Sequence, residues 1–175
     1  MRIQSVFEEL AVLQQEGLID SYAIGGAVGA TFYLEPFSTV DVDVFLDMQV
    51  QPGRILADPT PLLRRLAERG HRCEGEHVLI GGWPVQFLGP GNPLVHEALE
   101  QAAEFDVEGV LVRVFRAEHL AAIALQTGRA KDKARLLQFL EQGAVGMQIF
   151  EGILDRHHLR PQWAQFKQVF FGEEA

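Results

Sequence analysis

Two aspartates separated by one residue lie in an otherwise apolar stretch of the sequence, TVDVDVFLD (residues 39–47). If this stretch is a strand, Asp41 and Asp43 project from the same face, with about 6.5 to 7 Å between their Cα atoms. Two carboxylates this close repel each other unless a cation lies between them, and Mg²⁺ prefers oxygen ligands. The pair therefore predicts a site for Mg²⁺ or Mn²⁺. The alternative is that both side chains simply face solvent from a half-exposed strand.

A glycine pair precedes the aspartates and indicates a place where an anion can approach the backbone. Gly25 and Gly26 follow the short apolar run 22–24 and open AVGATFYLE, a stretch of small residues that predicts a helix. Backbone N–H groups at a helix start can hold phosphate oxygens. Glycine pairs also make ordinary turns, as we expect for Gly81-Gly82. In the order strand, Gly-Gly, helix and strand with D-x-D, the pattern predicts a phosphate site facing a metal site.

A basic cluster lies later in the chain, in GRAKDKAR (residues 128–135). It places Arg129, Lys131, Lys133 and Arg135 around Asp132, four bases and one acid, in a protein whose formal net charge is −9. On a helix Lys131 and Arg135 share a face, and Arg135 can pair with Asp132 at i, i+3. One interpretation is that Arg129 or Lys131 contacts a triphosphate or an RNA backbone. The alternative is a solvent-exposed helix start with local ion pairs.

The elements that must position these residues alternate between strands and helices over the first two thirds of the chain. Apolar periodicity and turn residues predict helices at 5–16 and 27–35, a helix capped at Thr60-Pro61 and one opened by Asn92-Pro93 within 91–104. They predict strands at 22–24, 40–46, 77–80, 83–88 and 110–115. From Arg116 onward only helices are expected, with breaks near Gly128, Gly143 and 160–161.

This pattern predicts an α/β (α+β) fold, with a mixed β-sheet flanked by helices and a helical subdomain at the C-terminal end. We expect an α/β core over 1–115 and a helical subdomain over 116–175 that packs on it. In the last predicted helix Trp163, Phe166, Phe170 and Phe171 are expected to dock on the core, and His157-His158 are expected to be surface histidines.

Composition narrows the class of protein further. The chain has 175 residues, 47% of them hydrophobic, enough for one normally packed domain. A single cysteine excludes an internal disulfide, and the acidic balance argues against nonspecific binding to nucleic acid or acidic lipid. No run of 18 apolar residues and no signal-peptide pattern is present. We therefore expect a cytoplasmic protein that does not contact membranes.

Two sets of residues resemble a known family. Gly25-Gly26 followed by Thr39-Val40-Asp41-Val42-Asp43-Val44 resembles the signature of the nucleotidyltransferase superfamily with the DNA polymerase β fold. Arg129, Lys131 and Asp132 match an R-x-K-D element that such proteins carry in their helical part. Within the superfamily the chain is most similar to small bacterial and archaeal proteins grouped with the toxin half of AbiE-type toxin–antitoxin systems. The resemblance spans residues 22–140.

The resemblance implies metal-dependent transfer of a nucleotidyl group from an NTP to an acceptor. The acceptor would be RNA such as tRNA, a protein or a small molecule, and a toxin would have an antitoxin protein as partner. Asp41 and Asp43 would be catalytic residues and ligands of Mg²⁺ or Mn²⁺. The residues that would bind the nucleotide or its phosphates are Gly25, Gly26, Thr39, Arg129 and Lys131.

The sequence also departs from the family pattern. Active members usually have a third carboxylate on a later strand, and the corresponding position here is Gln86, which is neutral and cannot act as a base. Glu76, Glu97 or another carboxylate would then have to substitute. Phe37 stands where related sequences often have an arginine. The alternative function is therefore a catalytically degenerate protein that acts as a nucleotide-binding or protein-interaction module.

Overall fold

The sheet of this protein contains seven strands among the described residues. They are β1 (Tyr22–Ile24), β2 (Val42–Leu46), β3 (Arg72–Glu74), β4 (His77–Ile80), β5 (Trp83–Leu88), β6 (Ala103–Val107) and β7 (Val110–Val114). The structure, a computed structural model, describes residues 2–35, 39, 41–47 and 59–172. Phe37 and Val40 lie outside the described residues. The strands follow the order β3-β4-β5-β2-β1-β7-β6.

The sheet is mixed, and its parallel pairs are central. β1 pairs antiparallel with β2 and parallel with β7, and β2 pairs parallel with β5. The outer pairs β3–β4, β4–β5 and β6–β7 are antiparallel hairpins. The parallel β2–β5 pairing sets Asp43 opposite Gln86, so the end of the sheet that carries the aspartates also carries the residue expected to replace a third carboxylate.

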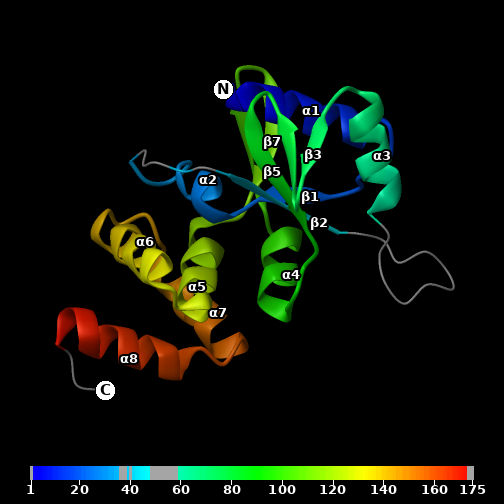
Figure 1. The fold of residues 1–175 in the computed structure, drawn as a ribbon. Helices are drawn as coiled ribbons and strands as arrows, with labels where there is room; N and C mark the ends of the chain where they lie inside the picture. The colour runs from blue at the N-terminus through cyan, green and yellow to red at the C-terminus, as the bar shows by residue number, and fades with distance from the viewer. Residues whose placement is uncertain (1, 36–38, 40, 48–58, 173–175) are drawn as a thin grey trace, which may run out of the picture.

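Helices cover both faces of the sheet (Figure 1). They are α1 (Ile3–Gln15), α2 (Gly26–Ala30), α3 (Thr60–Glu68), α4 (Pro93–Glu100), α5 (Ala117–Thr127), α6 (Ala130–Glu141), α7 (Met147–Arg156) and α8 (Arg160–Phe171). Helices α1 and α3 lie on one side, and α4 to α8 gather on the other, with α8 farthest from the N-terminus. None of these helices is long and apolar enough to cross a membrane.

Two hydrophobic clusters form the core. One packs α1 and α3 against Val42 and Val44 of β2, and the other packs α4 to α8 against Ala23 and Phe115. Full burial of a Leu or Phe side chain stabilises the fold by about 1.5–3 kcal/mol, so both faces of the sheet contribute. The second cluster contains residues from both sides of position 115. The division into 1–115 and 116–175 stays a prediction.

The predicted fold class is confirmed, and the local errors have clear causes. The predicted strand pattern at 22–24, 77–80, 83–88 and 110–115 agrees with the structure to within one residue, and Gly81-Gly82 form the hairpin turn with positive φ at both residues. The edge strands β3 and β6 were not predicted from the sequence. In β3 all three residues are exposed, so no apolar alternation marks it. The chain leaves α4 at Glu100 and enters β6, whose first residues had been assigned to the helix.

Candidate functional site

A cleft of about 330 Å³ opens between the sheet and the helices. One wall comes from α2, β2 and β5, and the opposite wall from α4, α5 and α6. The lining residues are Gly26, Ala27, Asp41, Asp43, Phe45, Gln86, Leu88, Asn92, Val95, Leu120, Ile123, Ala124, Gln126, Thr127, Arg129, Lys131, Asp132 and Arg135. Segments separated by about a hundred residues of sequence thus meet at one cavity.

Asp43 lies on the face of β2 that points into this cleft, and Asp41, the residue just before β2, lines the cleft beside it. Val42, Val44 and Leu46 are buried on the other face, because side chains alternate along the strand. Burial raises the pKa of the Asp43 carboxyl, and the Asp41 carboxylate beside it raises that pKa further. Asp41 and Asp43 therefore share a face, as predicted. A cation close to Asp43 would favour the charged form of its carboxyl.

The glycine pair packs directly against the aspartate strand. The backbone N–H of Gly25 donates to the Asp43 carbonyl oxygen at 3.0 Å, so Gly25 joins β1 to β2 and does not line the cleft. Gly26 lines the cleft and has φ of +56°, a left-handed conformation that glycine tolerates. A Cβ atom at Gly26 would overlap the Asp43 carboxylate oxygen Oδ2. The pair therefore lets the chain turn closely around Asp43.

The cationic wall comes from the start of α6. Its organising residue is Asp132, which is 2% exposed and accepts hydrogen bonds from Thr127 Oγ1 at 2.9 Å and Arg129 Nε at 2.5 Å. Arg135 Nη1 lies 3.4 Å from the same carboxylate, and the Arg135 side chain is 15% exposed. Charges on Lys131, Arg135 and Arg129 all oppose the rise in the pKa of Asp43, because these cations face it across the cleft.

The residues predicted to bind a nucleotide are thus partly brought together. Gly26, Arg129 and Lys131 line the cleft with the aspartates, whereas Thr39 does not. The Thr39 hydroxyl donates to the Asp41 carbonyl oxygen at 3.2 Å, which places it at the base of the aspartate segment. Their roles in binding stay predictions.

The sequence pattern missed several lining residues. Arg135 was expected to share a helix face with Lys131 and to pair with Asp132, but it was not predicted to line the site. Asn92 and Gln126 also line the cleft, where Asn92 Nδ2 donates to Gln126 Oε1 at 3.0 Å. Asn92 had been recognised only as a helix cap. No sequence signal pointed to Gln126.

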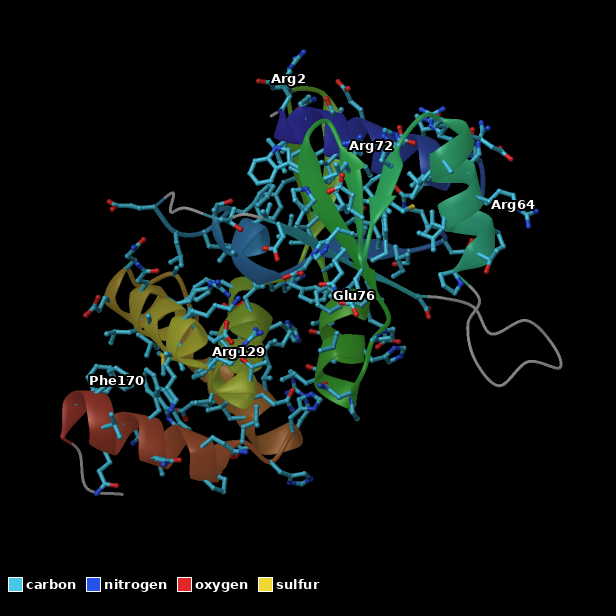
Figure 2. The ribbon with its side chains drawn as sticks, in the orientation of Figure 1. Arg2, Arg64, Arg72, Glu76, Arg129 and Phe170 are labelled. Atoms are coloured by element: carbon cyan, nitrogen blue, oxygen red, sulfur yellow. The ribbon has the colours of Figure 1, made fainter. Side chains whose placement is uncertain are left out.

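Gln86 is a cleft residue, and an acid lies next to it. Gln86 Nε2 donates to Glu76 Oε2 at 3.2 Å. Glu76 precedes β4 at the end of the β3–β4 hairpin, and Figure 2 shows it at the end of the sheet nearer α4. Glu76 does not itself line the cleft. Of the two substitutes considered for the third carboxylate, Glu76 is the one placed beside Gln86.

Glu97, the other substitute considered, does not line the cleft and pairs with basic side chains outside it. Its carboxylate accepts from Arg156 Nη2 at 2.6 Å, and it lies 2.6 Å from His157 Nε2 and 3.1 Å from His119 Nε2. The Arg156 hydrogen bond, with those of the two histidines, lowers the pKa of Glu97 to about 2. The expectation that His157 is a surface histidine was wrong, because its side chain is 11% exposed and contacts this carboxylate. Glu97 joins α4 to α5 and α7.

The site fits a divalent cation in the chemistry of its donors. Two neighbouring carboxylates, of which Asp43 is half-buried with a raised pKa, supply the hard oxygen ligands that Mg²⁺ accepts, with the remaining positions left to water and phosphate. Among the described residues, no group of three or more His, Cys, Asp or Glu side chains is placed to hold a metal. Asp41 and Asp43 are therefore the residues that would hold such a cation.

Comparison with solved structures identifies the fold. An antigenic nucleotidyltransferase-like protein from Paracoccidioides brasiliensis is similar, with a TM-score of 0.56 and 17% identity over 79% of this chain and 73% of that chain. The antibiotic-resistance factor ANT(2'')-Ia is similar with a TM-score of 0.52 and 15% identity, over 98% of both chains. The chain has the nucleotidyltransferase fold. No protein-family model matches the sequence, and no curated protein matches it.

The nucleotidyltransferase fold of this chain extends over its whole length in the second comparison. That coverage includes the C-terminal helices as well as the sheet. The α6 wall of the cleft therefore belongs to the shared fold. At these identities the likeness establishes the architecture, and the activity must be argued from the cleft.

Proposed function

We propose that this protein binds an NTP with Mg²⁺ in the cleft and transfers the nucleotidyl group to an acceptor hydroxyl. The observation that carries the proposal is the opposition of two charge sets across one cavity. Asp41 and Asp43 face the cleft from β2, and Arg129, Lys131 and Arg135 face it from α6. A metal-bound triphosphate needs carboxylates for the metal and cations for the phosphate oxygens.

The residues of the cleft divide the work. Asp41 and Asp43 would hold Mg²⁺, which when bound neutralises phosphate charge. Asp132 holds the Arg129 guanidinium, and the cations of α6 would neutralise phosphate oxygens that the metal leaves exposed. In the transfer the acceptor oxygen bonds to the α-phosphorus. The bond from that phosphorus to the bridging oxygen breaks, and pyrophosphate leaves with the electron pair.

The transfer also needs a group that takes the proton of the acceptor hydroxyl. We propose that the hydroxyl proton goes to Glu76, whose carboxylate accepts a hydrogen bond from the cleft residue Gln86. An RNA, a protein or a small molecule would each supply a suitable hydroxyl. A tRNA acceptor, a toxin role and an antitoxin partner rest on the family resemblance alone.

A second function is favoured by Gln86. A neutral side chain opposite Asp43 leaves the two aspartates without a third carboxylate on the neighbouring strand. The other carboxylate among the described lining residues, Asp132, already accepts from Thr127 and Arg129. A protein of this kind would bind a nucleotide without transferring it and would act as a nucleotide-sensing or protein-interaction module. Binding experiments alone do not separate the two functions, so transfer must be measured as well.

The first experiment is calorimetric titration of the four NTPs into the wild-type protein and the Asp43→Asn variant, with and without Mg²⁺. We expect binding that requires both Mg²⁺ and Asp43. Asp47→Asn is the matched control, because Asp47 follows the same strand but does not line the cleft. Labelled NTP incubated with RNA, protein and small-molecule fractions then tests transfer.

Each result has a definite meaning. Mg²⁺-dependent binding lost in Asp43→Asn but kept in Asp47→Asn supports the nucleotide site. Binding without label transfer to any fraction favours the degenerate binding module. If the wild type binds no NTP in the presence of Mg²⁺, the proposed function is wrong.

A further inference from the structure

The lining of the cleft contains two chemically different sets of residues. Asp41, Asp43 and the α6 cations form the charged set, which we call the charged end. The uncharged set that we call the amide end is built around Asn92 and Gln126, which hydrogen-bond to each other, with Leu88, Val95 and Ile123 among the aliphatic lining residues. Aliphatic walls with two primary amides suit a flat, uncharged group that presents fixed hydrogen-bonding atoms. In an NTP, such a group is the base attached to the sugar.

The orientation of the two amides is fixed by a chain of hydrogen bonds that starts at a helix cap. The Val95 backbone N–H donates to Asn92 Oδ1 at 3.0 Å, so that atom must be the oxygen. Asn92 Nδ2 then faces Gln126 and donates to its Oε1 at 3.0 Å. Because Gln126 Oε1 accepts that bond, the Nε2 amino group of Gln126 is turned away from Asn92. The backbone of α4 therefore determines that Gln126 offers donors.

We propose that the amide end holds the nucleobase and that Gln126 Nε2 donates to a carbonyl oxygen on the base. This inference rests on the proposed function. Uracil and guanine carry a carbonyl oxygen at the edge where cytosine and adenine carry an amino group. A donor at Gln126 pairs with the carbonyl and opposes the amino group. The site therefore prefers UTP and GTP over CTP and ATP.

The test compares binding of Mg²⁺-tripolyphosphate with binding of each of the four NTPs with Mg²⁺. Tripolyphosphate reports the charged end alone. For the wild type we expect a preference for UTP and GTP of about threefold to tenfold, the effect of one neutral hydrogen bond. Gln126→Leu should remove that preference and leave the tripolyphosphate affinity unchanged. Gln165→Leu is the matched control, since Gln165 lines a second cavity outside the cleft.

A second variant, Asn92→Asp, should reverse the preference among the NTPs. In Asn92→Asp the carboxylate still accepts from the Val95 N–H and keeps the helix cap. Its other oxygen faces Gln126 and accepts, so the Gln126 amide turns its amino group toward it and presents Oε1 to the cleft. The preference should then shift toward CTP and ATP. If circular dichroism shows that Gln126→Leu does not fold, Asn92→Asp tests the proposal in its place.

The outcomes separate this inference from the proposed function. If the wild type binds Mg²⁺-tripolyphosphate but shows no preference among the NTPs, the inference is overturned and the metal-phosphate site stands. A preference that survives in both Gln126→Leu and Asn92→Asp overturns it equally, because Gln126 also borders the second cavity and would then face that way. Absence of Mg²⁺-tripolyphosphate binding by the wild type overturns both proposals.

Discussion

The glycine beside Asp43 shows how a single missing side chain sets the geometry of the site. Gly26 combines a left-handed backbone with contact against the Asp43 carboxylate. Either feature alone disfavours a side chain, and together they leave glycine as the residue that fits. The position of the carboxylate and the identity of Gly26 are therefore coupled, and substitution should affect both binding and folding.

Gly26→Ala should weaken Mg²⁺-NTP binding by about tenfold or more, because the new Cβ displaces the Asp43 carboxylate. The left-handed conformation should also cost about 1–2 kcal/mol of stability. Titration calorimetry and urea unfolding measure the two effects. Gly91→Ala is the control, since a Cβ there meets no atom within 4 Å. Unchanged binding in Gly26→Ala would contradict the coupling of Gly26 to Asp43.

At the scale of elements, the junction of α5 and α6 organises the cationic wall. Gly128 ends α5 in a left-handed conformation, and Arg129 precedes the first turn of α6. Asp132 ties the two helices together, because it accepts from Thr127 of α5 and from Arg129. A buried carboxylate in this place serves the local structure and the orientation of the guanidiniums that face the cleft.

Asp132→Asn should lower the free energy of unfolding by about 1.5–3 kcal/mol, the usual worth of hydrogen bonds to a charged group. The amide keeps the shape but loses the charge that pairs with Arg129 and with Arg135. Urea unfolding measures the loss. The control is Asp155→Asn, an exposed partner of Arg160, for which we expect a much smaller loss, because solvent screens an exposed ion pair. Equal effects of both substitutions would show that burial of Asp132 adds nothing.

At the scale of the whole molecule, Glu97 connects the helices on the cleft side of the sheet. Its carboxylate contacts His119 of α5, Arg156 at the end of α7 and His157 just after it. One side chain of α4 thus connects α4, α5 and α7. The pKa of Glu97 lies at about 2 in the folded protein, below the ordinary 4.5. Its ionised form therefore contributes stability above pH 4.5, and this contribution is lost as the pH falls toward 2.

Glu97→Gln should reduce stability by about 1.5–3 kcal/mol at neutral pH. The deficit relative to the wild type should shrink as the pH falls from 4.5 toward 2, because over that window the unfolded wild-type chain takes up a proton on this carboxylate while the folded protein keeps it ionised. Thermal unfolding across this pH range is the measurement. Glu100→Gln on the same helix, whose side chain is exposed, should change stability by less than about 1 kcal/mol. A deficit for Glu97→Gln that is independent of pH would contradict the assignment.

The sequence by itself determined the local features of this protein. Alternation along 41–46 placed Asp41 and Asp43 on one face, since the two-residue period of a strand needs no distant contact. Asn92-Pro93 predicted the start of α4, because a cap bonds to the backbone three residues on. The order of the Gly-Gly and D-x-D motifs led to the nucleotidyltransferase fold that the solved structures share.

Only the tertiary structure decided which distant residues meet. Gln126 lies 34 positions from Asn92, and Glu97 lies 60 positions from His157, and no periodicity links either pair. The exposed edge strand β3 is held by pairing with β4, although its own residues are not buried. Such contacts depend on how helices pack on the sheet. Local sequence patterns report the conformation of each element. The amide end, and the contacts of Glu97 with His119, Arg156 and His157, arise where several elements converge.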